Sequence, residues 1–250
     1  MKIGIIGTGA IGGTIAKKLV QAGHEVKVFS SGEQHLLEKR AAELGVKPSV
    51  IDYITKNVDV VILSVPTIAI PQLDKKLFTD ISEKVIVVDT SNYYPFRDSE
   101  IEELKNGKVE SVWVSEQIGR PVIKAFNNLL AESLANGGKE TGDDRIAMAI
   151  SGDDENSKKV ISRLISDVGF DVVDAGTLSE SWRHQPGTPA YCTELNAAEL
   201  KQALIAGVRE DAPYLRDLTI TKLMARTSPP SHEEIVDFNR SLFPENPKRV

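Results

Sequence analysis

The sequence predicts an α/β fold, in which a doubly wound parallel sheet is followed by a helical C-terminal extension. Short apolar runs alternate with segments whose apolar residues recur at helical spacing, the pattern of a parallel sheet with helices on both faces. The first run ends in a glycine-rich turn that opens a helix. After residue 177 the apolar runs give way to helix-like segments. We therefore expect two parts, residues 1–176 and a mainly helical region 177–250.

The composition limits the classes of function. The chain has 250 residues, of which 41% are hydrophobic and 26% charged, as in an ordinary globular protein. Its formal charge of −6 disfavours nucleic acid or an anionic membrane as the main partner. The single cysteine, Cys192, excludes an intrachain disulfide and a cysteine metal cluster. The same cysteine count favours a reducing, cytoplasmic setting, and we expect no metal. Glycines and lysines interrupt the first apolar stretch, so we expect no signal peptide. No apolar run is long enough to span a bilayer, so we expect a soluble protein.

The apolar runs of the first part are typical of buried parallel strands. The first run ends at glycines, and the fourth, "DVVILSVP", is almost continuously apolar, so both of its faces should be covered. The predicted strands are Lys2–Ile6, Glu25–Phe29, Val46–Val50, Val60–Val65, Lys84–Asp89, Pro121–Phe126, Arg145–Gly152 and Phe170–Asp174.

Helices are predicted between these strands and after them. Apolar residues at helical spacing run from Ile11 to a stop at Gly23, and a second helix over Gln34–Leu44 should end at Gly45. A helix after the seventh strand begins with acids at 153–155, which suit the positive end of a helix dipole. The predicted C-terminal helices are Leu195–Ala206, Asp211–Ala225 and His232–Leu242.

The strongest functional signal is the turn "GTGAIG", which follows a strand and opens a helix. In such a turn Gly7 allows the tight bend, Gly9 lets the backbone approach a pyrophosphate, and Gly12 lets the helix pack on the strand. Unpaired N–H groups at the helix start then bind the phosphates. The motif predicts a Rossmann dinucleotide site, against the alternative of a glycine-rich turn without a ligand. Its predicted contacts are Gly7, Thr8, Gly9, Ala10, Ile11 and Gly12.

The end of the second strand determines which dinucleotide binds. A Rossmann domain that prefers NAD has an acid there, about 20 residues into the unit, bonded to the ribose 2′-hydroxyl. Here Ser30 and Ser31 occupy those positions, and the nearest acid, Glu33, lies beyond a glycine. Two hydroxyls leave room for a 2′-phosphate, so we expect NADP(H). Alternatively, both serines merely end the strand. The candidates for added positive charge are His35, which we count as a cofactor contact, Lys39 and Arg40.

Other strand ends should border the nicotinamide and a hydride acceptor, because ligands of such sheets bind at the carboxyl edge. The expected cofactor contacts there are Ser64, Val65, Pro66 and Asn127. The expected acceptor contacts are Ser91, Asn92, Tyr93, Ala131 and Trp182, with Tyr94 as a second stacking face. For the loop after the fifth strand the alternative is a turn with a packed aromatic. For Trp182 it is a loop anchor, which we slightly favour.

Two further residues invite a catalytic interpretation that we do not favour. Lys124 resembles the catalytic lysine of hydroxyacid dehydrogenases, but it sits inside an apolar strand rather than on a helix. We expect it to be structural and to point outward. His184 has no paired acid or serine nearby in sequence, so we expect it at the surface. No catalytic side chain is therefore predicted.

Several segments together resemble one known family. They read "GTGAIGGTIAKKLVQAGHEV", "DVVILSVP", "VVDTSNYYPFRD", "VIKAFNNL" and "SGDDENSKKVISRLISDVGFDVVDAGTLSES". They resemble the NADP oxidoreductases dependent on the deazaflavin coenzyme F-420, over about residues 1–182. The resemblance implies hydride transfer between NADP(H) and a deazaflavin stacked against the nicotinamide, with no metal and no essential nucleophile.

Two features depart from the family pattern. Members with deazaflavin activity tend to carry basic residues just after the second strand, where this chain has Ser31, Gly32 and His35. The region from Trp182 is longer than in the short archaeal form and resembles a bacterial branch with "SWR.QPGTP.YCT".

The leading hypothesis is therefore an NADP-dependent oxidoreductase with a small-molecule deazaflavin or flavin-like acceptor, in which binding and alignment supply most of the catalysis. A second hypothesis is an imine or carbonyl reductase similar to the pyrroline-carboxylate reductases, which would need a proton donor. A third is a non-catalytic protein that senses NADP(H). We expect a homodimer, with the C-terminal region as acceptor cover, dimer contact or both.

Overall fold

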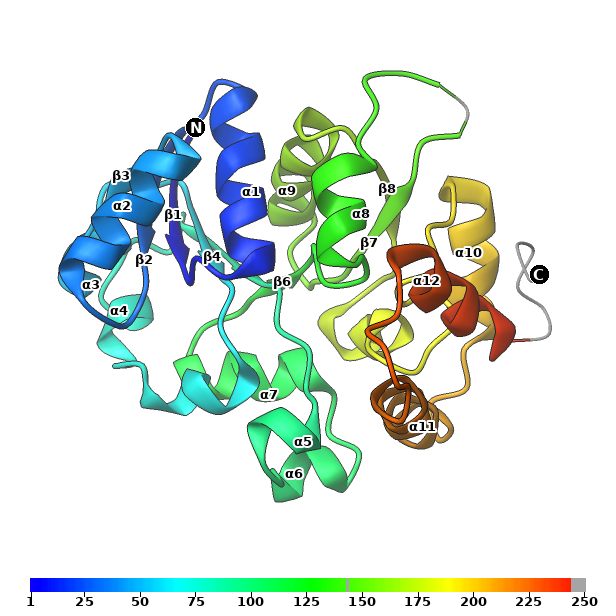
Figure 1. Cartoon of the computed structure of the whole chain (residues 1–250). Coiled ribbons are helices and arrows are strands. Elements are labelled where there is room, and N and C mark those ends of the chain that lie inside the picture. Colours follow the sequence, from blue (N-terminus) through cyan, green and yellow to red (C-terminus); the bar gives the residue numbers. More distant parts are fainter. Residues whose placement is uncertain (143, 244–250) are drawn as a thin grey trace.

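The computed structural model describes residues 1–142 and 144–243. Its larger sheet has six strands and lies in the left half of the view in Figure 1. The strand order is β3-β2-β1-β4-β5-β6, and every neighbouring pair is parallel. This order reverses direction between β1 and β4, as in a dinucleotide-binding doubly wound sheet. The strands are β1 (Lys2–Ile6), β2 (Glu25–Phe29), β3 (Lys47–Pro48), β4 (Val60–Leu63), β5 (Ile86–Asp89) and β6 (Ile123–Lys124).

Helices of very different length connect these strands. Two helices end at a glycine in the left-handed conformation: Gly45, with φ 72°, ends α2, and Gly119, with φ 69°, ends α7. The helices up to β8 are α1 (Ala10–Gln21), α2 (Gln34–Leu44), α3 (Ile51–Ile54), the 3-10 helix η1 (Thr67–Gln72), α4 (Lys76–Thr79), α5 (Pro95–Asp98), α6 (Glu102–Lys105), α7 (Glu110–Ile118), α8 (Ala131–Asn136) and α9 (Glu155–Asp167).

Side-chain alternation along the strands divides the core into two layers. On β1, Ile3 and Ile5 face a cluster that includes residues of α1, α2 and α9, whereas Ile6 belongs to the cluster on the opposite face. The second cluster is closed by short elements, α3, η1, α4 and α7, rather than by long helices. That face is therefore less completely covered, and it is where the main cleft lies.

The last two strands form a separate small sheet. β7 (Ala147–Ile150) and β8 (Asp171–Asp174) pair with each other in parallel, and an isolated antiparallel bridge between Lys124 and Ser151 joins this unit to β6. The small sheet is covered on one side by α9 and on the other by α10. The predicted strands exist, but the pair does not extend the main ladder.

The C-terminal region is helical, as expected, and lies beside the small sheet on the side away from β3 (Figure 1). It contains the 3-10 helix η2 (Leu178–His184), α10 (Ala197–Ala206), α11 (Ala212–Met224) and α12 (His232–Ser241). Capping boxes built on Asn196 and Ser231 begin α10 and α12. Within the described residues no helix has the length and apolar character to cross a bilayer. The predicted fold class is confirmed.

Candidate functional site

The glycine turn between β1 and α1 can be built only with glycine at two positions. Gly7 has φ 105°, and a Cβ there would lie 2.0 Å from the Ser64 carbonyl oxygen. A Cβ on Gly12 would lie 2.2 Å from the Gly7 carbonyl oxygen, so this residue allows α1 to pack closely on the end of β1. These are the two roles that the sequence predicts for the first and last glycines of the motif.

Gly9 shows a different constraint, because the space beside it is open. It is the N-cap of α1, its φ is −65°, and a Cβ built on it meets no atom within 4 Å. The fold therefore does not demand glycine here, whereas a ligand that approaches the backbone would. The first turn of α1 carries no acidic residue, so its free N–H groups present positive potential to an anion. This geometry fits a pyrophosphate.

A cleft of about 1190 Å³ opens beside the turn, between the ends of β1, β2 and β4 on one side and the α3 and η1–α4 segments on the other. Most of the predicted cofactor contacts line this cleft. They are Gly7, Thr8, Gly9, Ser30, Ser31, Ser64, Val65 and Pro66. The remaining predicted contacts lie outside its lining: Ala10, Ile11, Gly12, His35 and Asn127.

The end of β2 presents hydroxyls to the cleft. Ser30 and Ser31 line it, whereas the neighbouring acid Glu33 does not and instead pairs with His35 at 3.2 Å. Both members of that pair are largely exposed. The lining at this strand end thus contains no carboxylate that would repel a 2′-phosphate.

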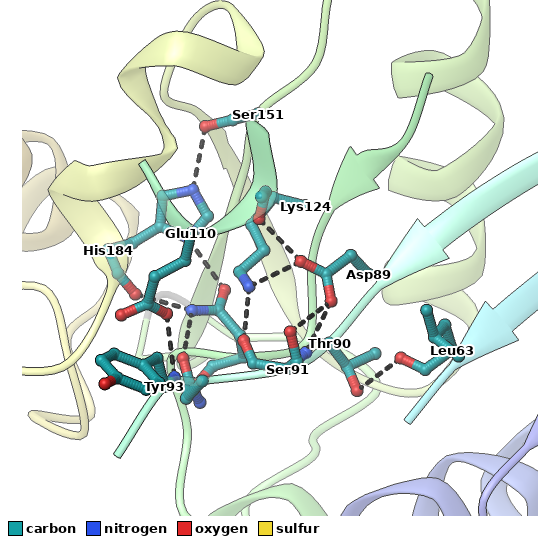
Figure 2. A network of polar contacts seen from close by, with 12 residues as sticks. Leu63, Asp89, Thr90, Ser91, Tyr93, Glu110, Lys124, Ser151 and His184 are labelled. Atoms are coloured by element: carbon teal, nitrogen blue, oxygen red, sulfur yellow. Dashed lines mark hydrogen bonds and ion pairs between the residues drawn. The ribbon is translucent and has the colours of Figure 1, made fainter. Parts of the chain in front are cut away.

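A buried ion pair lies where β5 and β6 end (Figure 2). Lys124 Nζ is 2.9 Å from Asp89 Oδ2, and both side chains are at most 1% exposed. The same carboxylate accepts hydrogen bonds from the Ser91 amide and hydroxyl and from the Ser111 hydroxyl. Lys124 also donates to the Ser91 carbonyl oxygen. The expectation that Lys124 points outward is wrong, because the acid that neutralises it lies on the neighbouring strand.

Asn127 and His184 form a second buried cluster beside this ion pair. The Asn127 amide nitrogen donates to Asn92 Oδ1 and to the His184 carbonyl oxygen, which leaves Asn127 Oδ1 to accept from His184 Nδ1 at 2.9 Å. His184 Nε2 then accepts from the Ser151 hydroxyl at 2.9 Å. Burial, with a smaller contribution from the charge on Lys124, lowers the pKa of His184 to about 3. The expected surface position of His184 is therefore wrong: it is a neutral, fully buried link.

The two adjacent tyrosines after β5 have different surroundings. Tyr93 is buried, and its hydroxyl donates to the Ser99 carbonyl and accepts from the Ile101 amide. Tyr94 remains half-buried, with its ring near the Arg97 guanidinium. Tyr93 is thus a packed aromatic, and Tyr94 offers the ring face of this loop.

Asp98 connects this loop to the cleft. Its buried carboxylate accepts from the Tyr94 amide at 3.0 Å and from the Ile68 amide at 3.4 Å. Ile68 follows Pro66, which lines the cleft. The loops after β4 and β5 are therefore held together at the carboxyl edge of the sheet, where the reacting end of a dinucleotide would lie.

Tyr94 meets Tyr191 from the C-terminal region, and their hydroxyl oxygens are 2.6 Å apart. The Asn92 amide donates to Tyr191 Oη at 3.3 Å. Burial raises the pKa of both phenols, so both stay protonated and neutral. One hydroxyl hydrogen is used between the two tyrosines. The other hydroxyl hydrogen of the pair can be donated to a bound acceptor. The Cys192 thiol, which also interacts with Tyr191, accepts hydrogen bonds only weakly.

The other expected acceptor contacts lie apart from this group. Trp182 is 7% exposed, lies under the Arg183 guanidinium at 4.5 Å and packs near Gly207, as a loop anchor does. Ala131 begins α8, which packs on α1. The Ser91 side chain is buried in its bond to Asp89. Of this predicted set, Asn92 alone contacts the tyrosine pair.

Sequence reasoning missed Tyr191, Asp98 and the role of Asp89. For Asp89 a signal exists, because an acid in one apolar strand and a lysine in the next predict a buried pair. For Tyr191 no local pattern indicates that it meets a residue 97 positions away. Among the described residues, no three histidine, cysteine, aspartate or glutamate side chains are grouped to hold a metal ion.

Comparisons with known sequences point to one family. A family model described as "NADP oxidoreductase coenzyme F-420-dependent" matches residues 2–93. The protein YjhV of Escherichia coli is 32% identical over 123 residues, which cover 49% of this chain and 83% of YjhV.

Solved structures extend the likeness over most of the chain. A hypothetical protein of Sinorhizobium meliloti, SMa0349, is 31% identical, with a TM-score of 0.67, and the match covers 78% of this chain and 95% of that protein. An Arthrobacter protein provisionally described as an F-420-dependent NADP reductase is 22% identical, with a TM-score of 0.59, over 72% of this chain and 87% of its own. At that identity the second likeness shows the fold alone.

The glycine turn yields a paired prediction. The free energy of unfolding of Gly9→Ala should lie within about 0.5 kcal/mol of the parent's value, because the added Cβ meets open space. It should nevertheless weaken NADPH binding at least about tenfold, since the methyl group occupies the path of the pyrophosphate. Gly7→Ala should instead lose at least about 2 kcal/mol of folding stability. Urea unfolding and calorimetric titration with NADPH measure both effects; unchanged NADPH affinity in Gly9→Ala would contradict the assigned site.

His184 predicts a pH dependence of stability. Its pKa is about 3 in the folded protein and about 6.5 when unfolded, so the unfolded state alone takes up this proton as pH falls below 6.5. The contribution of His184 to stability should fall by about 2 kcal/mol between pH 7 and pH 5. The variant His184→Gln has no imidazole to protonate on unfolding. If it is less stable than the parent at pH 7, the difference in the free energy of unfolding should therefore be smaller at pH 5 by about 2 kcal/mol.

Urea unfolding of both proteins at pH 7, 6 and 5 measures the difference. Glu110, whose pKa burial raises to about 7, titrates in both proteins and cancels in the comparison. A stability difference that does not change with pH would show that folding does not lower the pKa of His184.

Proposed function

Since this chain belongs to the NADP oxidoreductases dependent on coenzyme F-420, we propose that it transfers a hydride between NADP(H) and a deazaflavin or flavin-like acceptor. The protein is an oxidoreductase with a Rossmann fold; its cofactor NADP(H) and its acceptor are the proposed parts. The observation that carries the proposal is the open cradle at Gly9, which leads into a cleft with two serines and no acid at the end of β2.

The dinucleotide would extend from the end of β2 across the glycine turn toward the end of β4. Ser30 and Ser31 would hold the 2′-phosphate, and the first turn of α1 would hold the pyrophosphate with backbone N–H groups. Ser64, Val65 and Pro66 would border the path to the nicotinamide. The bound cofactor supplies the hydride. Asn127 would act by orienting Asn92, to which its amide is bonded.

The acceptor would contact Asn92, Tyr94 and Tyr191, which are supplied by both parts of the chain. A neutral phenol donates a hydrogen bond without bringing a negative charge, so it suits the carbonyl oxygens of a planar, electron-poor ring. We accordingly assign residues 1–176 to dinucleotide binding and region 177–250, of which the described part ends at 243, to covering the acceptor.

The same tyrosine pair favours a second candidate, reduction of a carbonyl or imine. That reaction needs a hydride at carbon and a proton at oxygen or nitrogen. A neutral Tyr94 hydroxyl can give its proton to an alkoxide, which is a stronger base than a phenolate, and solvent can restore it. The pair thereby supplies the proton donor that sequence reasoning lacks.

We further propose that the protein forms a homodimer in the reducing environment of the cytoplasm. Three large apolar side chains on α10 and α11 are strongly exposed, namely Ile205 (80%), Tyr214 (69%) and Met224 (68%). A second copy packed on these helices would cover them. The single cysteine, Cys192, is free and buried, as a reducing compartment permits.

An absorbance assay tests the proposed acceptor. NADPH consumption should be fast with oxidised deazaflavin, slower with FMN and negligible without an acceptor, and NADH should be a poorer donor in each case. Turnover with FMN and deazaflavin alike would indicate a general flavin reductase. Binding of NADPH without turnover on any acceptor would contradict hydride transfer to these rings and favour a sensor.

Tyr94→Phe separates the two candidate reactions. It removes one hydrogen bond while keeping the ring, so deazaflavin turnover should fall only about threefold to tenfold, mainly through a higher KM for the acceptor. Carbonyl or imine reduction should instead lose at least about a hundredfold in kcat, because the proton donor is gone. Steady-state kinetics with deazaflavin and with a panel of cyclic imines and 2-oxo acids distinguish these results, and Tyr93→Phe, altered at a buried neighbour, is the matched control.

A further inference from the structure

The wall of the cleft opposite the glycine turn is built by a segment with no part in the site predicted from sequence. Residues 51–56 follow β3, include α3 and lie on the face of the sheet that the second core cluster covers. Ile54 is fully buried there, and a Cβ on Gly4 would lie 2.2 Å from its carbonyl oxygen. Lys27 on β2 donates to the carbonyl oxygens of Tyr53 and Lys56 at 2.5 and 2.6 Å. The backbone that carries these two residues is thus held against the sheet.

Tyr53 and Lys56 both line the cleft that Ser30 and Ser31 also line. Tyr53 is 61% exposed, so one ring surface is available to a ligand. Lys56 Nζ lies 4.8 Å from the centre of that ring and, among the described residues, forms no ion pair. An exposed aromatic ring next to a lysine without an ion-pair partner can bind a nucleotide: the ring stacks on the base, and the lysine pairs with a phosphate close to that base.

Two other cations near the end of β2, His35 and Arg40, are less suited to this task. His35 is paired with Glu33, and neither lines the cleft. The Arg40 guanidinium lies beside α1, close enough to Gly13 that a Cβ there would approach it to 2.9 Å, and it pairs with Glu43.

Lys76 lines the cleft as well, but its surroundings are acidic. Asp74 and Asp80, from the same short stretch of chain, also line the cleft, and Asp74 accepts a hydrogen bond from the Lys76 amide. Two carboxylates in the same part of the lining make this end of the cleft less favourable for a phosphate. Lys56 has Asp52 as its acidic neighbour in the lining, and its ammonium group sits over the Tyr53 ring instead.

We propose that Tyr53 and Lys56 recognise the 2′-phosphoadenosine end of NADP(H): Tyr53 stacks on the adenine, and Lys56 pairs with the 2′-phosphate held by Ser30 and Ser31. This inference rests on the proposed function and names its cofactor-specificity residues. Lys56 thus supplies, from the segment after β3, the positive charge that the family places after β2. Because NADH has a hydroxyl where NADPH has the phosphate, Lys56 affects the choice between the two cofactors, whereas Tyr53 affects both.

Calorimetric titration of the full-length protein with NADPH, NADH and adenosine 2′,5′-bisphosphate tests the assignment. Lys56→Gln should weaken binding of NADPH and of the bisphosphate about tenfold and change NADH binding less than twofold. It should also make NADPH affinity less dependent on salt. Tyr53→Leu should weaken NADPH and NADH by a similar factor, about threefold to tenfold. Lys76→Gln, a substitution in the same cleft, is the matched control and should have little effect.

The outcomes separate this inference from the function on which it rests. Both lysines are exposed, so the thermal unfolding midpoints of the variants should match that of the parent. If the parent binds NADPH and Lys56→Gln leaves its preference over NADH unchanged, the inference is overturned while the proposed function stands. A selective loss in Lys76→Gln rather than Lys56→Gln would overturn it equally. If the parent binds neither dinucleotide, both proposals fail together.

Discussion

The buried ion pair between Asp89 and Lys124 is the interaction on which the carboxyl edge of the sheet depends. Removing two charges from water is costly, and such a pair is tolerated only when the remaining hydrogen-bonding capacity is satisfied. Here the carboxylate accepts from the lysine, from the amide and hydroxyl of Ser91 and from the Ser111 hydroxyl. Replacing one partner alone would leave the other charge unpaired, so the two residues act as a unit.

This requirement fixes more than the two strands. Because Lys124 also donates to the Ser91 carbonyl, the first turn after β5 is tied to β6, and Asn92 follows directly after this turn. Asn92 in turn meets Asn127 and Tyr191, and Asn127 meets His184. A chain of satisfied polar contacts thus runs from the sheet into the C-terminal region. The proposed acceptor site lies where that chain ends, which explains why it needs residues from both parts of the protein.

The sequence was most informative where structure is local. The helix over Gln34–Leu44 has the predicted bounds because a left-handed glycine ends it, and the first glycine turn follows from steric limits that any sequence with this motif shares. The small β7–β8 sheet shows the limit of such reasoning, because an apolar run indicates a strand but not its neighbour. Lys124 and His184 were misjudged for a related reason: their partners are distant in sequence, and without a partner a polar residue is expected in water.

The two ends of the proposed site use different chemistry, and the difference suits the reaction. Around the glycine turn, backbone N–H groups and serine hydroxyls would bind the phosphates of the dinucleotide, whatever the acceptor is. Around Tyr94 and Tyr191 the donors are neutral, and burial keeps them so. A ring or carbonyl that receives a hydride gains negative charge, so a fixed anion beside it would oppose the transfer, whereas preorganised neutral donors stabilise the charge as it forms. The Asp89 carboxylate lies at the same edge of the sheet, but it is paired with Lys124 and accepts three further hydrogen bonds. Its negative charge is therefore balanced within the protein and does not oppose the arrival of a hydride at the acceptor.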